Sequence, residues 1–303
     1  MKLNHRDVLY GTPFAHGSRR NVLAELPNLT FDSIVNSPFV SPETRCTRHD
    51  YLPENVRLPS VTYINQCVHP KETLCKWQSK KKNELGASFS QWSIDLMNAG
   101  TRTHREIEKI LEEFQKSGKI EQSDEEIISS VTAPKVEMQD RVRSFMKSIL
   151  PFLRKNLIYD EKMRIEESVV HNGLYYTGRF DAICSLGGEG LMLVDWKTVS
   201  QASLDGGVSD AELYGYPSQL AAYVGAINAD PKFEDLGSIA KAADVLIYED
   251  ERPAEMVVYQ GEELQMYWEE WLQKLNKYWW TMKNYEGDKV DFTYKPPEST
   301  LDE

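Results

Sequence analysis

The sequence predicts an α/β fold of the α+β kind, in which a helical region precedes short strands. Apolar residues recur at helical spacing through about residue 160. Short strands bounded by glycine-containing turns follow to about residue 198, and a helix, two strands and a long helix complete the order. We therefore expect one folded domain over residues 58–290, with a helical N-terminal part over residues 58–160.

The composition is that of a globular protein with a substantial core. The chain has 41% apolar residues, yet no apolar run reaches the ~18 residues that a membrane-spanning helix needs, so no membrane partner is expected. A formal net charge of −12 argues against a protein that coats polyanions nonspecifically, although it leaves room for a local basic groove. The cysteines show no CxxC spacing, which disfavours a disulfide scaffold or a structural zinc site and fits a reducing compartment.

The two ends of the chain have the composition of tails. Residues 1–57 are rich in Pro, Asn, Ser and Thr without a sustained period, and residues 291–303 contain “KPPESTLDE”, so we expect both segments to be disordered. Residues 1–24 are basic and poor in acids. An organelle transit peptide has this composition, and so does a plain disordered tail, so both interpretations stay open.

Three helices are expected before the first strand. One covers about residues 70–85, and a second begins near Thr101 and stops at Gly118, because glycine is the usual residue just after a helix end. Residues 119–135 are acidic and are expected to form a loop. A third helix follows, and Pro151 is expected to kink or end it.

Three short strands come next, “KMRIEESVV”, “LYYTGRFDAI” and “GLMLVDWKT”, and we expect them to form an antiparallel meander. Asn172-Gly173 marks the first turn and Gly187–Gly190 the second. After a polar loop over Ser200–Gly215, the pattern predicts a helix in “SQLAAYVGAIN”, strands in “ADVLIYED” and “AEMVVYQ”, and a last helix over about Glu262–Tyr285. The aromatic stripe of the last helix indicates core packing rather than a base-stacking platform.

Two aspartates and a lysine stand in apolar strands, where charged side chains are costly. Asp181 lies near the end of one strand and Asp195 near the end of the next, at a spacing that lets a hairpin bring them side by side. The two-residue period of a strand puts Asp195 and Lys197 on one face and Trp196 on the other, towards a helix layer. Close carboxylates are tolerated if a cation sits between them, and oxygen ligands select Mg²⁺ or Mn²⁺.

Such a set of side chains is sufficient for metal-assisted hydrolysis of a phosphodiester. Lys197 would hold or help to deprotonate the attacking water. The alternative is structural, with Asp195 and Lys197 as an exposed pair on an edge strand and Asp181 as a turn acid. The apolar context of “LMLVDWKT” and the upstream aspartate favour a site.

Further residues join this candidate site. A glutamate of “RIEESVV” lies on the first strand of the meander, and Glu167 is the expected residue, with Glu166 as the competitor because the alternation cannot be phased firmly. Gln219 and Tyr223 are four positions apart on one helix and share a face. His104 begins the apolar stripe of its helix, where a core histidine bonded to a backbone carbonyl is the ordinary alternative.

Together these residues resemble the PD-(D/E)xK nuclease superfamily in its RecB-like exonuclease branch. That branch has a helical His, a strand Glu, a strand Asp, a D-x-K and a Q-x-x-x-Y, which match in order His104, Glu167, Asp181, Asp195-Trp196-Lys197 and Gln219 to Tyr223. Phe180 replaces the proline, and Asp195 takes the D/E position. “LPSVT”, “NAGTRTHREIEKIL”, “EESVV”, “GRFDAI”, “LVDWKT” and “QLAAYVGAIN” are similar to the mitochondrial genome maintenance exonucleases, over roughly Leu58–Tyr285.

The resemblance implies a restriction-endonuclease-like core, with a central mixed β-sheet flanked by helices, and a DNA exonuclease that depends on Mg²⁺ or Mn²⁺. The metal ligands that it implies are His104, Asp181, Asp195 and the Trp196 carbonyl. Lys197 would orient the attacking water, Glu167 would help to organise the site, and Gln219 and Tyr223 would position the metal ligands or the DNA backbone. The implied partner is single-stranded DNA at ends and flaps, bound by a monomer in the mitochondrial matrix, or in the cytoplasm for a phage or bacterial relative.

Two basic stretches give modest support for DNA binding. “KWQSKKK” contains Lys80, Lys81 and Lys82 beside a tryptophan. A second stretch begins with Arg141 and Arg143. Such patches can contact phosphates in a chain that is acidic as a whole, and ordinary solvated helix faces are the alternative.

Three other functions compete with an exonuclease. An iron–sulfur nuclease needs a cysteine cluster after the Q-x-x-x-Y element, and no cysteine follows Cys184, so no such cluster is expected. A structure-specific or flap endonuclease of the same fold would cut substrates that lack free ends. A catalytically silent nucleic-acid-binding protein would usually have lost a carboxylate or the lysine, and this chain keeps them.

Overall fold

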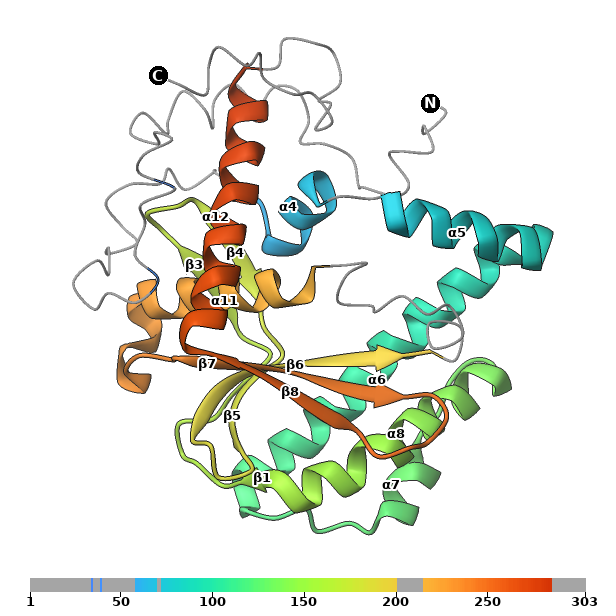
Figure 1. Ribbon diagram of the computed structural model, residues 1–303. Helices are drawn as coiled ribbons and strands as arrows, with labels where there is room; N and C mark the ends of the chain where they lie inside the picture. The colour runs from blue at the N-terminus through green and yellow to red at the C-terminus, as the bar shows by residue number, and fades with distance from the viewer. Residues whose placement is uncertain (1–33, 35–38, 40–57, 70–71, 201–214, 285–303) are drawn as a thin grey trace.

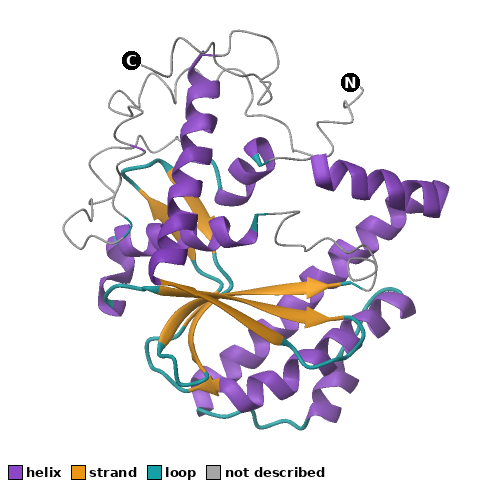
Figure 2. Ribbon diagram, in the orientation of Figure 1, coloured by secondary structure: helices purple, strands orange, loops and turns teal. Residues whose placement is uncertain are grey.

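A mixed six-stranded sheet lies between two layers of helices (Figure 1, Figure 2). The structure, a computed structural model, describes residues 34, 39, 58–69, 72–200 and 215–284. Nearly all of the two expected tails, and most of the loop expected over Ser200–Gly215, fall outside these residues. The architecture confirms the predicted α/β fold with a central mixed sheet flanked by helices. None of the described helices combines the length and the apolarity that a membrane crossing requires.

The sheet has the strand order β1-β5-β6-β7-β8, and β2 pairs with β5 beside this path. Its strands are β1 (Leu157–Ile158), β2 (Arg164–Ile165), β5 (Ala182–Leu186), β6 (Leu191–Val199), β7 (Lys241–Tyr248) and β8 (Glu255–Gln260). β6 and β7 run parallel, and every other pair is antiparallel. β6 is largely buried because helices cover both faces of the sheet.

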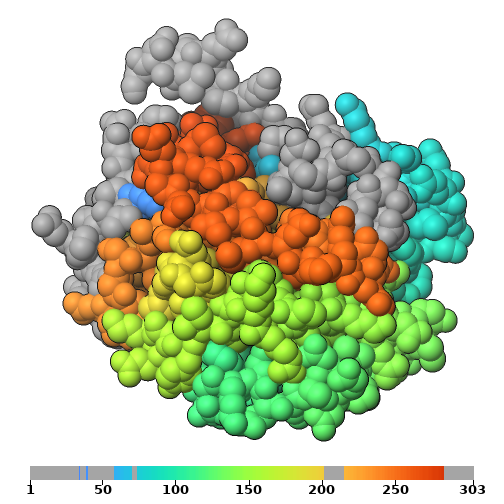
Figure 3. All heavy atoms as spheres, turned by 60° about the horizontal axis from the view of Figure 1, so that its bottom comes forward, coloured from blue at the N-terminus to red at the C-terminus, as the bar shows by residue number. Residues whose placement is uncertain are grey.

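The helices divide into two layers with separate apolar cores. One layer consists of α6 (Phe89–Ser117), α7 (Asp124–Ser130) and α8 (Val136–Asn156), and its core includes Trp196. The other consists of α4 (Val61–Val68), α11 (Tyr216–Ala229) and α12 (Gly261–Asn284). Figure 3 looks onto the first layer, whose green atoms lie against the orange atoms of the β7–β8 region. Trp196 thus points into a helix layer, as the strand period predicted.

The helix bounds differ from the predicted ones in several places. α6 begins at Phe89 rather than near Thr101, because its early turns pack aromatic rings on α5 (Glu72–Leu85), and the rings of Trp77 and Trp92 lie 6.2 Å apart. Gly118 ends α6 with a φ of 72°, as predicted. A short 3₁₀ helix, η3 (Gly86–Ser88), joins α5 to α6.

Two further predictions, both for the segment after α6, are wrong: a loop over residues 119–135 and a kink or end at Pro151. The expected loop over residues 119–135 contains α7, which begins with a capping box between Ser123 and Glu126. α8 continues through Pro151, because a proline removes only one backbone hydrogen bond and the apolar stripe of α8 stays buried. A second 3₁₀ helix, η4 (Pro231–Leu236), follows α11.

The expected three-strand meander is only partly correct. β5 and β6 form the predicted antiparallel hairpin, but the two strands before β6 each break in two. β3 (Ser168–His171) and β4 (Tyr176–Arg179) form a separate two-stranded sheet. The chain kinks at Glu166, whose φ of 52° is left-handed, and Glu166 N–H donates to the Asp181 carbonyl across the break. The acidic residues of the candidate site therefore meet at a kink rather than along a regular strand.

Candidate active site

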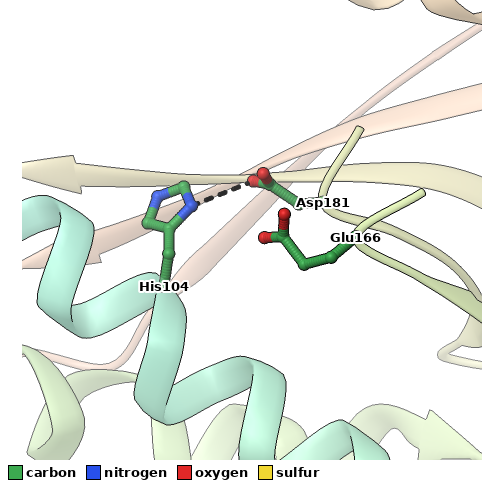
Figure 4. A group of neighbouring side chains, drawn as sticks. All are labelled: His104, Glu166 and Asp181. Atoms are coloured by element: carbon green, nitrogen blue, oxygen red, sulfur yellow. Dashed lines mark ion pairs between the residues drawn. The ribbon is translucent and has the colours of Figure 1, made fainter. Parts of the chain in front are cut away.

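The candidate site forms where α6 passes the ends of β5 and β6. Gly100 lets the helix come close, because a Cβ at that position would lie 3.1 Å from the Thr198 Oγ1 atom at the end of β6. One turn further along α6, His104 faces Asp181, and its Nδ1 lies 3.3 Å from Asp181 Oδ2 (Figure 4). The helical histidine therefore lies beside Asp181 in the candidate site rather than inside the apolar core.

Asp181 is held by the next strand as well as by His104. Its Oδ2 accepts a hydrogen bond of 2.8 Å from the backbone N–H of Trp196. Burial opposes ionisation of Asp181, but His104 and this N–H lower its pKa. Burial would likewise lower the pKa of His104, and the Asp181 carboxylate outweighs it and raises that pKa to about 9. At neutral pH the pair is therefore an imidazolium beside a carboxylate.

Three side chains converge as a candidate metal site. His104, Glu166 and Asp181 each offer one ligand atom, and these atoms lie within 4.8 Å of one another (Figure 4). The ligands come from α6, from the kink after β2 and from the residue before β5. An imidazole and two carboxylates can hold a divalent cation.

The structure brings Glu166, rather than Glu167, to Asp181. Burial and the Asp181 charge raise the pKa of Glu166, and its carboxylate pairs with Arg179 Nε at 2.7 Å. The Glu167 carboxylate instead lies 2.5 Å from Lys232 Nζ. The left-handed backbone at Glu166 interrupts the strand alternation, so no periodicity in the sequence could have decided between the two residues.

Asp195 and Lys197 form a buried ion pair next to this cluster. Lys197 Nζ lies 2.5 Å from Asp195 Oδ2, and Asp195 is only 6% exposed. Burial raises the pKa of Asp195, even though Lys197 acts in the opposite direction. Burial would lower the pKa of Lys197, but Asp195 and then Asp244 raise it. In this geometry Asp195 is the counter-ion of Lys197 and lies next to the three-residue cluster.

The Q-x-x-x-Y element on α11 lies beside Lys197. Gln219 Oε1 is 3.4 Å from Lys197 Nζ, and Gln219 Nε2 donates to the Tyr223 hydroxyl at 3.1 Å. Tyr223 packs on Gly178, where a Cβ would come within 2.3 Å of its ring, so this glycine cannot be replaced without displacing the tyrosine. Tyr216, which the sequence reasoning missed, lies three positions before Gln219, and its ring centroid is 4.0 Å from Lys197 Nζ.

A second residue that the sequence reasoning missed is Asp244 in the middle of β7. It is in register with Asp195, it is 2% exposed, and burial raises its pKa to about 7. The signal was a lone carboxylate inside the largely apolar strand “KAADVLIY”. That is the same kind of signal that identified Asp195.

Negative charge exceeds positive charge at this site. The carboxylates are Glu166, Asp181, Asp195 and Asp244, and the neighbouring cations are His104, Lys197 and Arg179, which pairs with Glu166. Burial raises the pKa of three of these four acids, which means that the surrounding side chains compensate their ionised forms poorly. A divalent cation would supply the missing positive charge, so the donor set fits such an ion.

The basic residues expected to contact DNA have different surroundings. Lys80 and Lys82 are exposed on α5, and Lys81 pairs with Glu84 at 2.8 Å. Arg141 on α8 pairs with Glu249 at 2.7 Å, and Arg143 lies 3.8 Å from Asp140. Acidic partners thus offset the charge of both arginines, and α5 offers the more accessible basic surface.

Comparison with known proteins decides the family. The family model described as the PD-(D/E)XK nuclease superfamily matches residues 76–296, which is well over half of the chain and includes every candidate site residue. The chain belongs to the PD-(D/E)XK nuclease superfamily. The resemblance seen in the sequence is thereby confirmed at the level of the family.

This nuclease also has curated relatives, each named mitochondrial genome maintenance exonuclease 1. The protein of Homo sapiens is 25% identical over 248 residues, which cover 80% of this chain and 64% of the relative. The protein of Mus musculus is 25% identical over 285 residues, 92% of this chain and 76% of the relative. The protein of Xenopus tropicalis is 26% identical over 231 residues, 74% of this chain and 58% of the relative. The nuclease thus spans less than two thirds of the length of the human and frog proteins.

Replacing Glu166 by glutamine should weaken binding of Mn²⁺ to this nuclease by about tenfold to a hundredfold, because an amide oxygen carries no charge and binds a hard cation less strongly. Glu167→Gln is the matched control, since its carboxylate pairs with Lys232 instead, and it should change the affinity by less than about twofold. Isothermal titration calorimetry measures both. A larger loss for Glu167→Gln would contradict the ligand assignment.

Proposed function

We propose that this nuclease is a divalent-metal-dependent exonuclease that hydrolyses phosphodiester bonds in single-stranded DNA, at ends and flaps. The observation that carries the proposal is the cluster of His104, Glu166 and Asp181 beside the buried Asp195–Lys197 pair. Action on ends is supported by the relatives, which are named exonucleases.

His104, Glu166 and Asp181 would hold the cation, with Asp195 and the Trp196 carbonyl as further ligands. Mg²⁺ or Mn²⁺ bound there would polarise a phosphate oxygen and make water a stronger nucleophile. The backbone N–H of Trp196 is already bonded to Asp181 and keeps that carboxylate oriented towards His104. The protein would therefore present a rigid set of ligands, which lowers the cost of arranging them around an ion.

Lys197 would stabilise charge and orient the attacking water. The nearby carboxylates raise its pKa, which keeps Nζ protonated and favours a hydrogen-bond donor over a general base. Gln219 and Tyr216 border the ammonium from α11, and Tyr223 fixes Gln219 in turn. These contacts support a role for the Q-x-x-x-Y element in positioning Lys197, and the exposed Lys80 and Lys82 are proposed to contact DNA phosphates.

The proposed location is the mitochondrial matrix, and the proposed state is a monomer. The location is supported by the names of the relatives and by the basic, acid-poor composition of residues 1–24. A fluorescent reporter fused to residues 1–57 should enter mitochondria. A reporter that stays diffuse in the cytosol would refute this part of the proposal.

Cleavage of linear single-stranded DNA, but not of the same DNA closed into a circle, tests the proposed activity. With Mg²⁺ the nuclease should degrade an end-labelled linear oligonucleotide and leave the circle intact, and chelator should stop the reaction. The product ladder from each labelled end gives the polarity. Cleavage of the circle would make the protein an endonuclease, and no cleavage with any divalent metal would favour a silent nucleic-acid-binding protein.

A further inference from the structure

Asp244 is a buried carboxylate that the proposed chemistry does not yet use. It lies in the middle of β7, directly opposite Asp195 on the parallel strand β6. Residues paired in this way point to the same face of the sheet, and neighbouring strands are ~4.8 Å apart. Asp244 therefore faces the α11 side of the sheet, as Asp195 and Lys197 do.

The packing of β7 does not account for this carboxylate. The residues around it on the strand are apolar and buried, and Asp244 itself is 2% exposed. Tyr259 on β8 interacts with Asp244 as a side-chain hydrogen-bond partner, which lowers the pKa of Asp244 and raises that of Tyr259, although the geometry of this contact falls short of a full hydrogen bond to either carboxylate oxygen. A weakly placed phenol does not compensate a buried carboxylate fully, so an apolar residue would suit the stability of this position better.

Lys197 is the cation that acts most strongly on the Asp244 carboxylate. Among the neighbouring charges that act on Asp244, the first is the Lys197 ammonium, followed by the Asp195 carboxylate. Asp244 in turn acts on Lys197 more strongly than any other acid except Asp195. Lys197 is paired with Asp195, and Asp244 lies in register with Asp195 on the adjacent strand and on the same face of the sheet.

The Asp195 carboxylate would take part in two interactions, one with Lys197 and one with the divalent cation. It is the close counter-ion of Lys197, whose Nζ lies 2.5 Å from Asp195 Oδ2. If it also ligates the divalent cation, part of its charge goes to that ion, and its hold on Lys197 weakens. The remaining contacts of Lys197 on α11 are the neutral side chains of Gln219 and Tyr216.

We propose that Asp244 is a positioning residue that anchors the Lys197 ammonium when the Asp195 carboxylate turns to the metal. This inference rests on the proposed function, because it assumes a cation bound beside Asp195. Asp244 would keep Lys197 aligned for the attacking water without touching the DNA or the metal. The buried charge would then be a cost in stability that the active site imposes on the fold.

Nuclear magnetic resonance of the lysine ammonium groups tests the proposal without measuring cleavage. In wild type the Lys197 ammonium signal, assigned by its loss in Lys197→Arg, should stay observable when Mg²⁺ is added, because the group remains held. In Asp244→Val and Asp244→Asn it should vanish on addition of Mg²⁺ through faster exchange with water. A signal that persists in both variants would overturn the proposal, as would a wild-type protein that fails to bind Mg²⁺.

Two further measurements separate positioning from a structural role. Asp244→Val should melt a few degrees higher than wild type without metal, because a buried uncompensated charge is replaced by a strand-forming apolar residue. Its kcat should fall by about tenfold to a hundredfold, with KM and Mg²⁺ affinity changed less than about twofold. Asp244→Asn should lose kcat similarly, and the exposed Asp250→Asn should change neither quantity.

The experiments distinguish a failure of the proposed nuclease function from a failure of the role proposed for Asp244. If wild type cleaves no DNA, the proposed function fails, while the lysine signals still decide whether Asp244 holds Lys197. If wild type cleaves DNA and Asp244→Asn keeps full kcat, the charge of Asp244 is not needed and the inference fails alone. If Asp244→Val loses thermal stability and activity together, Asp244 has a structural role instead.

Discussion

Replacing Lys197 by alanine should reduce the cleavage rate by about a hundredfold to ten-thousandfold, while DNA binding changes little. The ammonium is placed by Asp195, Gln219 and Tyr216, so its loss removes the donor that would align water and stabilise charge on the phosphate. Single-turnover cleavage of an end-labelled oligonucleotide measures the rate. Fluorescence anisotropy of labelled DNA in chelator measures binding.

Controls must separate lost chemistry from lost folding in that experiment. Lys197→Ala leaves two buried carboxylates without their ammonium, which can destabilise a protein by about 3–5 kcal/mol, so a thermal melt accompanies each assay. Lys197→Arg keeps the charge and should fold, yet its planar guanidinium does not reproduce a compact ammonium, so cleavage should still fall strongly. Lys241→Ala removes a half-buried partner of the exposed Glu189 and should leave the rate unchanged. Undiminished cleavage by Lys197→Ala would contradict the role proposed for Lys197 in cleavage.

Replacing Asp181 by asparagine should abolish tight metal binding and cleavage. Asp181 is the residue that both His104 and the Trp196 N–H contact, so its charge organises the ligand cluster. Calorimetric titration with Mn²⁺ should show a loss of at least about a hundredfold in affinity. Asp250→Asn is the matched control on an exposed aspartate. Unchanged affinity in Asp181→Asn would contradict the metal site.

The same variant changes the titration of His104. In metal-free wild type the folded-state pKa of His104 is raised to about 9, above the ~6.5 of an unfolded chain. The His104–Asp181 pair therefore contributes stability that is fully present below pH ~6.5 and is lost as the pH rises through about 9. Without the Asp181 charge, burial should bring the His104 pKa below its ordinary value. Thermal melts in chelator should then show a smaller loss of stability over this pH range for Asp181→Asn than for wild type.

The core of the site could be predicted because it depends on local pattern. The apolar run of β6 with a carboxylate and an ammonium two residues apart predicts their common face, and the glycine turn before it predicts the hairpin with β5. α11 was predicted for the same reason, since Gln219 and Tyr223 lie one turn apart. The capping box of Ser123 and Glu126 was also visible in the sequence and was overlooked, which is why α7 was expected to be a loop.

The remaining features depend on contacts between distant segments. The left-handed backbone at Glu166 is favoured by pairing across the kink, and no local rule puts a glutamate in that conformation. The extra turns of α6 before Thr101 pack on α5, which periodicity within α6 does not report. Asp244 joins the site only because β7 pairs in parallel with β6 at one particular register. A parallel pairing across an intervening helix leaves no short-range signal.

Anomalous diffraction from crystals grown with Mn²⁺ tests the central claim most directly. A manganese peak should lie within coordination distance of His104, Glu166 and Asp181, with Asp195 turned towards it and Lys197 still held on the β7 side. The peak should be absent in crystals of Asp181→Asn grown under the same conditions. Manganese bound elsewhere, or no peak in wild type at a saturating concentration, would contradict the assignment of this cluster as the active centre.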